Sequence, residues 1–139
     1  MHVYIEVADL DRALAFYTTG LSLSESRRFT PRWAELSGAC VPIHLLARPE
    51  PSFDAGATVL ARSFERHWTP VHVDLIVEDL EVSLAQALAA GATLDRDVVD
   101  HHYWRMANLA DPFGNGIDLI QFDHGGYPAF MMAQTTQPG

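Results

Sequence analysis

The sequence has a single cysteine, Cys40, among 139 residues. A lone thiol cannot form an internal disulfide, so the chain is not built around an oxidising compartment. We interpret Cys40 as a small buried apolar residue rather than as a nucleophile. The sequence also lacks an apolar run of bilayer-spanning length and a basic N-terminal region followed by an apolar stretch. These absences disfavour a membrane span and a signal peptide, and they leave the cytoplasm as the expected location.

Positive charge is scarce: 9 Lys and Arg residues stand against 18 Asp and Glu residues, for a formal net charge of −9. Such a chain does not attract a phosphate backbone or an anionic membrane surface by its long-range field. We therefore expect no nucleic-acid and no membrane partner. Hydrophobic residues make up 48% of the chain and charged residues 19%, a mixture typical of a globular protein, and the length fits one domain.

Residues 2–20 show a strand pattern followed by a helix pattern. Val3, Ile5 and Val7 alternate with His2, Tyr4 and Glu6, which predicts a strand with one apolar face and one polar face. Asp9, two residues after Val7, is a helix N-cap candidate, and apolar residues then recur at helical spacing up to Gly20.

The same pattern returns 70 residues later. When His2 is placed over His72, the stretch HVYIEVADLDRALA lies over HVDLIVEDLEVSLA, and Asp79 takes the N-cap position of Asp9. An internal match of this kind indicates a duplicated structural unit. Near the end of each copy, Ile43-His44-Leu45-Leu46 resembles Ile117-Asp118-Leu119-Ile120.

The remaining segments complete both copies. Short strands are predicted between residues 21 and 47, a hairpin with its turn near 100–102 within residues 93–110, and a last strand near 117–122. The sequence thus predicts a single α+β domain with two βαβββ modules, which form a curved mixed sheet around a central cleft with the helices outside. Module one spans 1–47, a Pro- and Gly-rich linker 48–69, module two 70–122 and a C-terminal tail 123–139, whose end is expected to be loose.

The repeat predicts which side chains share the cleft. His2 and His44 from module one, and His72 and Asp118 from module two, each lie opposite the apolar face of their strand. Three imidazoles and a carboxylate form a ligand set that suits a divalent Zn, Ni, Fe or Mn ion. Taken singly, His2 and His72 are also explained as polar residues at strand starts.

This pattern resembles the vicinal-oxygen-chelate superfamily, which includes glyoxalase I, extradiol dioxygenases and the fosfomycin- and bleomycin-resistance proteins. The resemblance is carried by His2-x6-Asp9 with Phe16-Tyr17, by His72-x6-Asp79, and by the run from Asp111 to Asp118 (DPFGNGID). It implies metal ligands on the first and fourth strands of each module, here His2, His44, His72 and Asp118. It also implies a homodimer, with a site that lies within one chain or across two.

The chain departs from the glyoxalase I pattern, which has glutamate at both fourth-strand positions, here His44 and Asp118. The set His2, His72 and Asp118 resembles the triad of the dioxygenases and resistance enzymes, with His44 as a fourth ligand or a base. The resemblance thus implies a metal-dependent lyase, isomerase or dioxygenase that acts on a small oxygen-chelating substrate. Glu6 and His44 are the candidates for proton transfer.

Aromatic residues on the predicted strands offer a second interpretation. Side chains suited to hold a planar or carboxylated substrate are Tyr4, Trp33, Tyr103, Trp104 and Arg105. Without a metal, the same cleft would sequester an aromatic or cationic molecule, as a bleomycin-resistance-like protein does. Core packing and a solvated arginine explain these residues nearly as well. The alternation leaves open whether Arg105 or Trp104 faces inward.

Overall fold

The computed structural model describes all residues except 49–62, 68, 70, 124 and 136–139. The first half of the chain folds as the predicted βαβββ module. Its elements are β1 (Val3–Val7), α1 (Leu10–Ala15), the π-helical turn η1 (Phe16–Gly20), β2 (Ser24–Thr30), β3 (Trp33–Ser37) and β4 (Ile43–Ala47). The four strands form one sheet in the order β1-β4-β3-β2, in which β1 runs parallel to β4.

The second half repeats this arrangement and adds a C-terminal helix. Its elements are β5 (Val73–Ile76), α2 (Leu80–Ala89), β6 (Thr93–Leu94), β7 (Val99–His101), β8 (Trp104–Ala110), β9 (Gly116–Phe122) and α3 (Gly126–Thr135). The sheet order is β5-β9-β8-β6, with β7 paired to β8, and β5 is parallel to β9. The predicted α+β class with two βαβββ modules is confirmed.

Both helix starts are fixed by the predicted aspartate caps. The carboxylate of Asp9 accepts a hydrogen bond from the backbone N–H of Arg12 at 2.8 Å, and Asp79 accepts one from Val82 at 2.9 Å. Each carboxylate satisfies a backbone donor that the first helical turn leaves without a partner. The same short sequence signal therefore ends a strand and begins a helix in each module.

Strand alternation buries one face of each sheet beneath its helix. In β1, Ile5 and Val7 are buried, whereas Tyr4 is exposed on the other face. In module two, Ile117 and Leu119 of β9 belong to the same core cluster as Leu80 of α2. The opposite face of each sheet, which we call the open face, therefore carries the polar residues.

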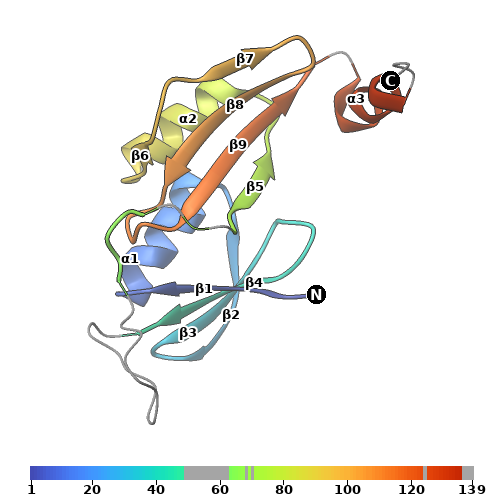
Figure 1. Ribbon diagram of the computed structural model, residues 1–139. Helices are drawn as coiled ribbons and strands as arrows, with labels where there is room; N and C mark the ends of the chain where they lie inside the picture. The colour runs from blue at the N-terminus through green and yellow to red at the C-terminus, as the bar shows by residue number, and fades with distance from the viewer. Residues whose placement is uncertain (49–62, 68, 70, 124, 136–139) are drawn as a thin grey trace, which may run out of the picture.

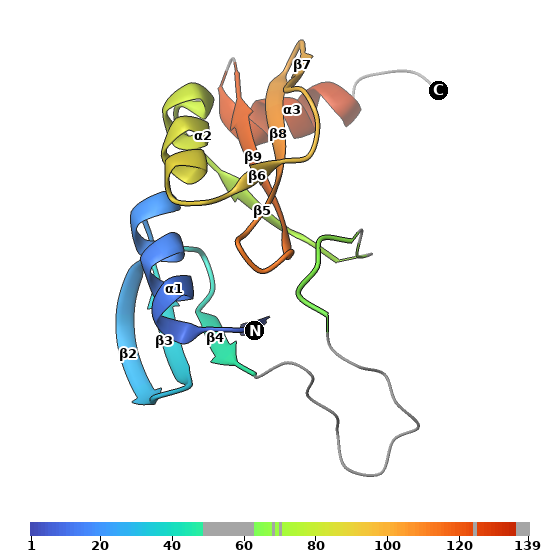
Figure 2. The same cartoon turned by 90° about the vertical axis from the view of Figure 1, so that its left-hand side faces the viewer.

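The two modules meet where η1, which continues α1, packs against α2, and Figures 1 and 2 show the two helical segments next to each other. The end of η1 packs against α2, and a Cβ atom at Gly20 would lie 2.7 Å from the Cβ of Ala90. Only glycine permits this close approach without a shift of the backbone. The Gln86 side chain also donates to the carbonyl of Thr19, so the contact is both packed and hydrogen-bonded.

Several details differ from the sequence-based predictions. Cys40 is exposed in the β3–β4 connection, so the interpretation of a buried apolar residue is wrong. The hairpin turn lies at residues 102–103, because His101 pairs with Trp104. The C-terminal tail contains helix α3, which was not predicted, and the end of the tail lies outside the described residues. The predicted linker falls largely outside the described residues. No helix in the described part of the chain is long and apolar enough to cross a membrane.

Candidate functional site

The open face of module one brings two imidazoles and a carboxylate together. His2 precedes β1, Glu35 lies on β3 directly opposite His44 of β4, and their ligand atoms all lie within 4.8 Å of one another. The Nδ1 atom of His2 is 2.8 Å from Nε2 of His44, and a Glu35 oxygen is 3.6 Å from that same Nε2. We call these three residues the module-one group.

Aromatic rings enclose His44, which is only 3% exposed. Tyr4 stacks on the imidazole at 4.5 Å between ring centroids and an interplanar angle of 9°. The indole Nε1 of Trp33 donates a hydrogen bond to Nδ1 of His44 at 3.0 Å, and Phe29 stacks on Trp33 at 4.2 Å. The His44 ring is therefore held both in its plane and at both of its nitrogens.

The open face of module two brings one imidazole and two carboxylates together. Asp74 of β5 pairs in register with Asp118 of β9, and His72 shares the face of Asp74 because it lies two residues earlier. The Nε2 atom of His72 is 3.2 Å from Asp74 and 3.4 Å from Asp118, and all three ligand atoms lie within 4.8 Å of one another. We call these residues the module-two group.

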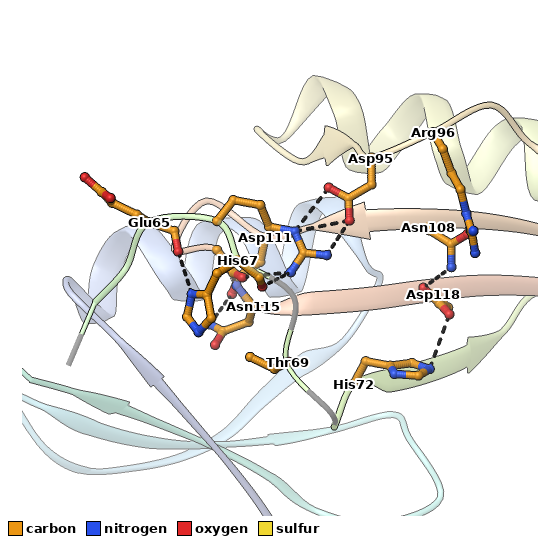
Figure 3. Close-up of polar contacts among 12 residues, drawn as sticks. Glu65, His67, Thr69, His72, Asp95, Arg96, Asn108, Asp111, Asn115 and Asp118 are labelled. Atoms are coloured by element: carbon orange, nitrogen blue, oxygen red, sulfur yellow. Dashed lines mark hydrogen bonds and ion pairs between the residues drawn. The ribbon is translucent and has the colours of Figure 1, made fainter. Parts of the chain in front are cut away.

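A chain of hydrogen bonds orients Asp118 (Figure 3). Its Oδ1 atom accepts a bond of 2.7 Å from the amide of Asn108, and the Asn108 carbonyl accepts one of 2.6 Å from Arg96. Asp118 is 7% exposed, so these bonds compensate for much of its lost hydration. The other oxygen, Oδ2, faces His72. Outer partners of this kind hold a carboxylate in the position in which it binds a metal ion.

Burial and charge act against the ionisation of Asp74. Desolvation is the main cause that raises the pKa of Asp74 above its ordinary value, the adjacent Asp118 raises it further, and His72 lowers it. Two carboxylates held close together repel each other, and a cation between them removes the repulsion. The module-two group thus fits a divalent ion in both its geometry and its charge.

The four predicted metal ligands fall into two pairs. His2 and His44 lie in the module-one group, and His72 and Asp118 lie in the module-two group. Among the described residues, the groups with every ligand atom within 4.8 Å of the others each draw on one module. The strand alternation that predicted the polar face is confirmed, whereas metal ligation stays a prediction.

The other predicted site residues have different surroundings. Glu6 lies 3.5 Å from the guanidinium of Arg48. Arg105 forms ion pairs with Glu81 of α2 and with Asp100, so its side chain lies on the helix side of the sheet. Alternation then places Trp104 on the open face, where it stacks on His101 at 5.1 Å.

Tyr103 occupies the β7–β8 turn, where its ring makes an edge contact with His102. Sequence reasoning did not assign Glu35, Asp74 or Asn108 to a ligand group. The sequence does indicate that Asp74 shares the cleft face with His72, because it lies two residues later in the chain. Glu35 and Asn108 come from neighbouring strands, and only the pairing register shows that they face His44 and Asp118.

An open crevice of about 380 Å³ adjoins the module-two group. Its lining residues are Arg66, His67, Asp95, Arg96 and Asn108. Arg66 is anchored there by hydrogen bonds to both carboxylate oxygens of Asp95. The volume lies within the range of small-molecule pockets, about 300–1,000 Å³. Asn108 therefore connects the ligand group to a space of the size that a small molecule needs.

Two βαβββ modules, each with a candidate metal-ligating group on its open face, define the class of fold to which the chain belongs. The sequence model of the glyoxalase-like domain matches residues 2–120, so the chain belongs to the glyoxalase-like family, within the vicinal-oxygen-chelate superfamily. No curated protein sequence matches the chain.

Solved structures share this fold at low sequence identity. A glyoxalase/bleomycin resistance protein/dioxygenase family enzyme from Burkholderia phytofirmans PsJN is 21% identical, with a TM-score of 0.65 and coverage of 87% of this chain and 96% of that chain. A glyoxalase-related enzyme from Fulvimarina pelagi is 16% identical, with a TM-score of 0.68 and coverage of 86% and 85%. The fosfomycin resistance protein FosX from Listeria monocytogenes is 14% identical, with a TM-score of 0.65 and coverage of 87% and 90%.

Proposed function

We propose that the chain is a metal-dependent enzyme that holds one divalent ion through His72, Asp74 and Asp118. The observation that carries this proposal is the convergence of one imidazole and two carboxylates within 4.8 Å on the open face of module two. Imidazole and carboxylate ligands suit Zn, Ni, Fe or Mn, and a second carboxylate favours the harder ions of that series.

The proposed substrate is a small molecule with two neighbouring oxygen atoms. A bound divalent ion supplies Lewis acidity, which stabilises negative charge on a substrate oxygen. Asn108 holds Asp118 in place, and the adjoining crevice accommodates the rest of the molecule. Lyase, isomerase and dioxygenase chemistry all fit this description.

We also propose a homodimer formed through the sheet edges. In the described part of the chain, β1 and β5 each lie at one end of their sheet, with β2 and β6 at the opposite ends. Large apolar side chains on or beside these strands are exposed, with Tyr4 at 57%, Ile76 at 65% and Val71 at 78%. An edge strand with exposed apolar side chains favours pairing with another chain.

Metal titration tests the proposal. Protein purified without a histidine tag and stripped with chelator is titrated with Zn²⁺, Ni²⁺ and Mn²⁺ by calorimetry. We expect the protein to bind one equivalent of at least one of these ions, and we expect His72→Ala to abolish that binding. His101→Ala is the matched control, because His101 lies in the same module and stacks on Trp104 outside the group. Absence of stoichiometric binding in the parent protein, or an equal loss in the control, would refute the proposal.

A metal-free binding protein is the second candidate function. It is favoured by the stacked rings on the open face of module one, where Tyr4 and His44 lie parallel and Phe29 stacks on Trp33. Such a surface binds aromatic or cationic molecules through ring stacking. Retention of ligand binding in the chelator-treated protein distinguishes this function from metal-dependent chemistry.

A further inference from the structure

The hydrogen bond between Trp33 and His44 fixes where His44 carries its proton. An indole N–H is only a donor, so the Nδ1 atom that faces it must offer a lone pair. A neutral imidazole has one protonated nitrogen, and the proton of His44 is therefore on Nε2. A flipped His44 ring would leave the indole N–H facing a carbon atom. The observed ring orientation is therefore the one that gives the indole N–H an acceptor.

The direction of the hydrogen bond between His44 and His2 follows from the same count of ring protons and lone pairs. His44 Nε2 lies 2.8 Å from His2 Nδ1, and one of the two nitrogens must donate. If His2 were the donor, both His44 nitrogens would be acceptors, which requires an imidazolate. His44 is thus the donor and His2 the acceptor. The chain of bonds runs one way, from Trp33 through His44 to His2, and it leaves the second nitrogen of a neutral His2 as an N–H donor.

This direction conflicts with metal ligation by His44. The module-one group meets the distance requirement for an ion. A metal bond at Nε2 would nevertheless move the proton to Nδ1, where it would face the indole N–H at 3.0 Å in a buried site. The indole would then lose its acceptor, and buried donors without an acceptor are costly.

We propose that Trp33 is a positioning residue that sets the tautomer of His44, and that His44 orients His2 by a hydrogen bond instead of ligating a metal ion. The module-one group then offers one N–H donor, at Nε2 of His2, to an oxygen acceptor of the ligand. Tyr4 supports this role, since its parallel ring keeps the imidazole in the plane of both hydrogen bonds. The inference concerns module one alone and does not depend on a metal ion in module two.

Nitrogen NMR reads the tautomer directly. The full chain, labelled with ¹⁵N-histidine and stripped of metal, is recorded in two-bond ¹H–¹⁵N correlation spectra at neutral pH. We expect a protonated Nε2 and an unprotonated Nδ1 for His44, both unchanged after one equivalent of Zn²⁺. A protonated Nδ1, or a coordination shift at Nε2, would overturn the inference. If the ion fails to bind, the tautomer alone still decides the question.

The variant Trp33→Phe removes the indole N–H and keeps an aromatic ring against Phe29. We expect His44 to become a mixture of its two tautomers. Because the conflict at Nδ1 is gone, we expect Trp33→Phe to gain Zn²⁺ binding at the module-one group in a His72→Ala background, in which the protein with Trp33 binds no Zn²⁺. Trp104→Phe, in module two, is the matched control and leaves the His44 signals in place. A single unchanged His44 tautomer in Trp33→Phe would contradict the role assigned to Trp33.

Discussion

Replacement of Asp74 by Asn separates two effects of this carboxylate. One is its destabilising repulsion in the metal-free protein, and the other is its proposed contribution to metal affinity. In the metal-free protein, Asp74 is a half-exposed carboxylate beside Asp118, and its pKa is raised above the ordinary value. The native state therefore binds more protons than the unfolded state between the two pKa values of Asp74, and stability falls as pH rises through that window. We expect Asp74→Asn to stabilise the metal-free protein at neutral pH, by about 0.5 kcal/mol or less because solvent screens the repulsion.

The same substitution removes a proposed metal ligand. Loss of an outer partner of a ligand typically costs about 10–100-fold in metal affinity, so we expect loss of Asp74 itself to cost about 100-fold or more. With metal at 100 times the dissociation constant, the parent protein gains about 2.7 kcal/mol, whereas the variant gains about 0.4 kcal/mol. For a chain of 139 residues, these gains correspond to increases in Tm of about 9 °C and about 1.5 °C.

Scanning calorimetry with and without metal measures both effects in one pair of samples. Asp100→Asn is the control, because Asp100 also lies in module two but outside the group, next to Arg105. The reasoning is refuted if Asp74→Asn keeps the full metal-induced shift. It is also refuted if the variant is less stable than the parent protein without metal, because the ionised Asp74 would then not destabilise the native state.

Two further predictions concern the module contact and the proposed dimer. Gly20→Ala should lower Tm by a few degrees, because overpacking costs about 1–3 kcal/mol. The double variant Gly20→Ala/Ala90→Gly should recover most of this loss. If the double variant loses as much Tm as Gly20→Ala, the 2.7 Å approach to Ala90 is not the cause. Ile76→Lys should convert the proposed dimer to a monomer, as measured by chromatography with light scattering. Val82→Lys, at a similarly exposed apolar residue on α2, should leave the mass unchanged. A monomeric parent protein, or an Ile76→Lys variant that remains a dimer, would contradict the edge pairing.

Local signals made most of the fold predictable from the sequence. The alternation in residues 2–8 and the aspartate caps at Asp9 and Asp79 act within a few residues, so the repeat carries them into both modules. Helix α3 was not predicted, for a local reason. Gly126 and Pro128 are turn signals, but proline is tolerated in the first turn of a helix, which is where Pro128 lies in α3.

The composition of the two ligand groups was only partly predictable. His72 and Asp74 share a face because they are two residues apart on one strand, and this relation is visible in the sequence. The pairing of Asp74 with Asp118, and of Asn108 with Asp118, depends on strand register. The sequence symmetry also does not reveal that Gly20 and Ala90 bring the modules together through their helices.

The repeat conserves positions while the chemistry of the two halves has diverged. In module one, the bonds from Trp33 to His44 lead to an imidazole that donates. In module two, the bonds from Arg96 through Asn108 lead to a carboxylate whose other oxygen accepts. The corresponding residues of the two sheets, judged by their register, are Tyr4 and Asp74, Glu35 and Asn108, and His44 and Asp118. A donor end suits a ligand oxygen and an acceptor end suits a cation, so one duplicated fold supplies both kinds of contact that an oxygen-rich ligand and a divalent ion require.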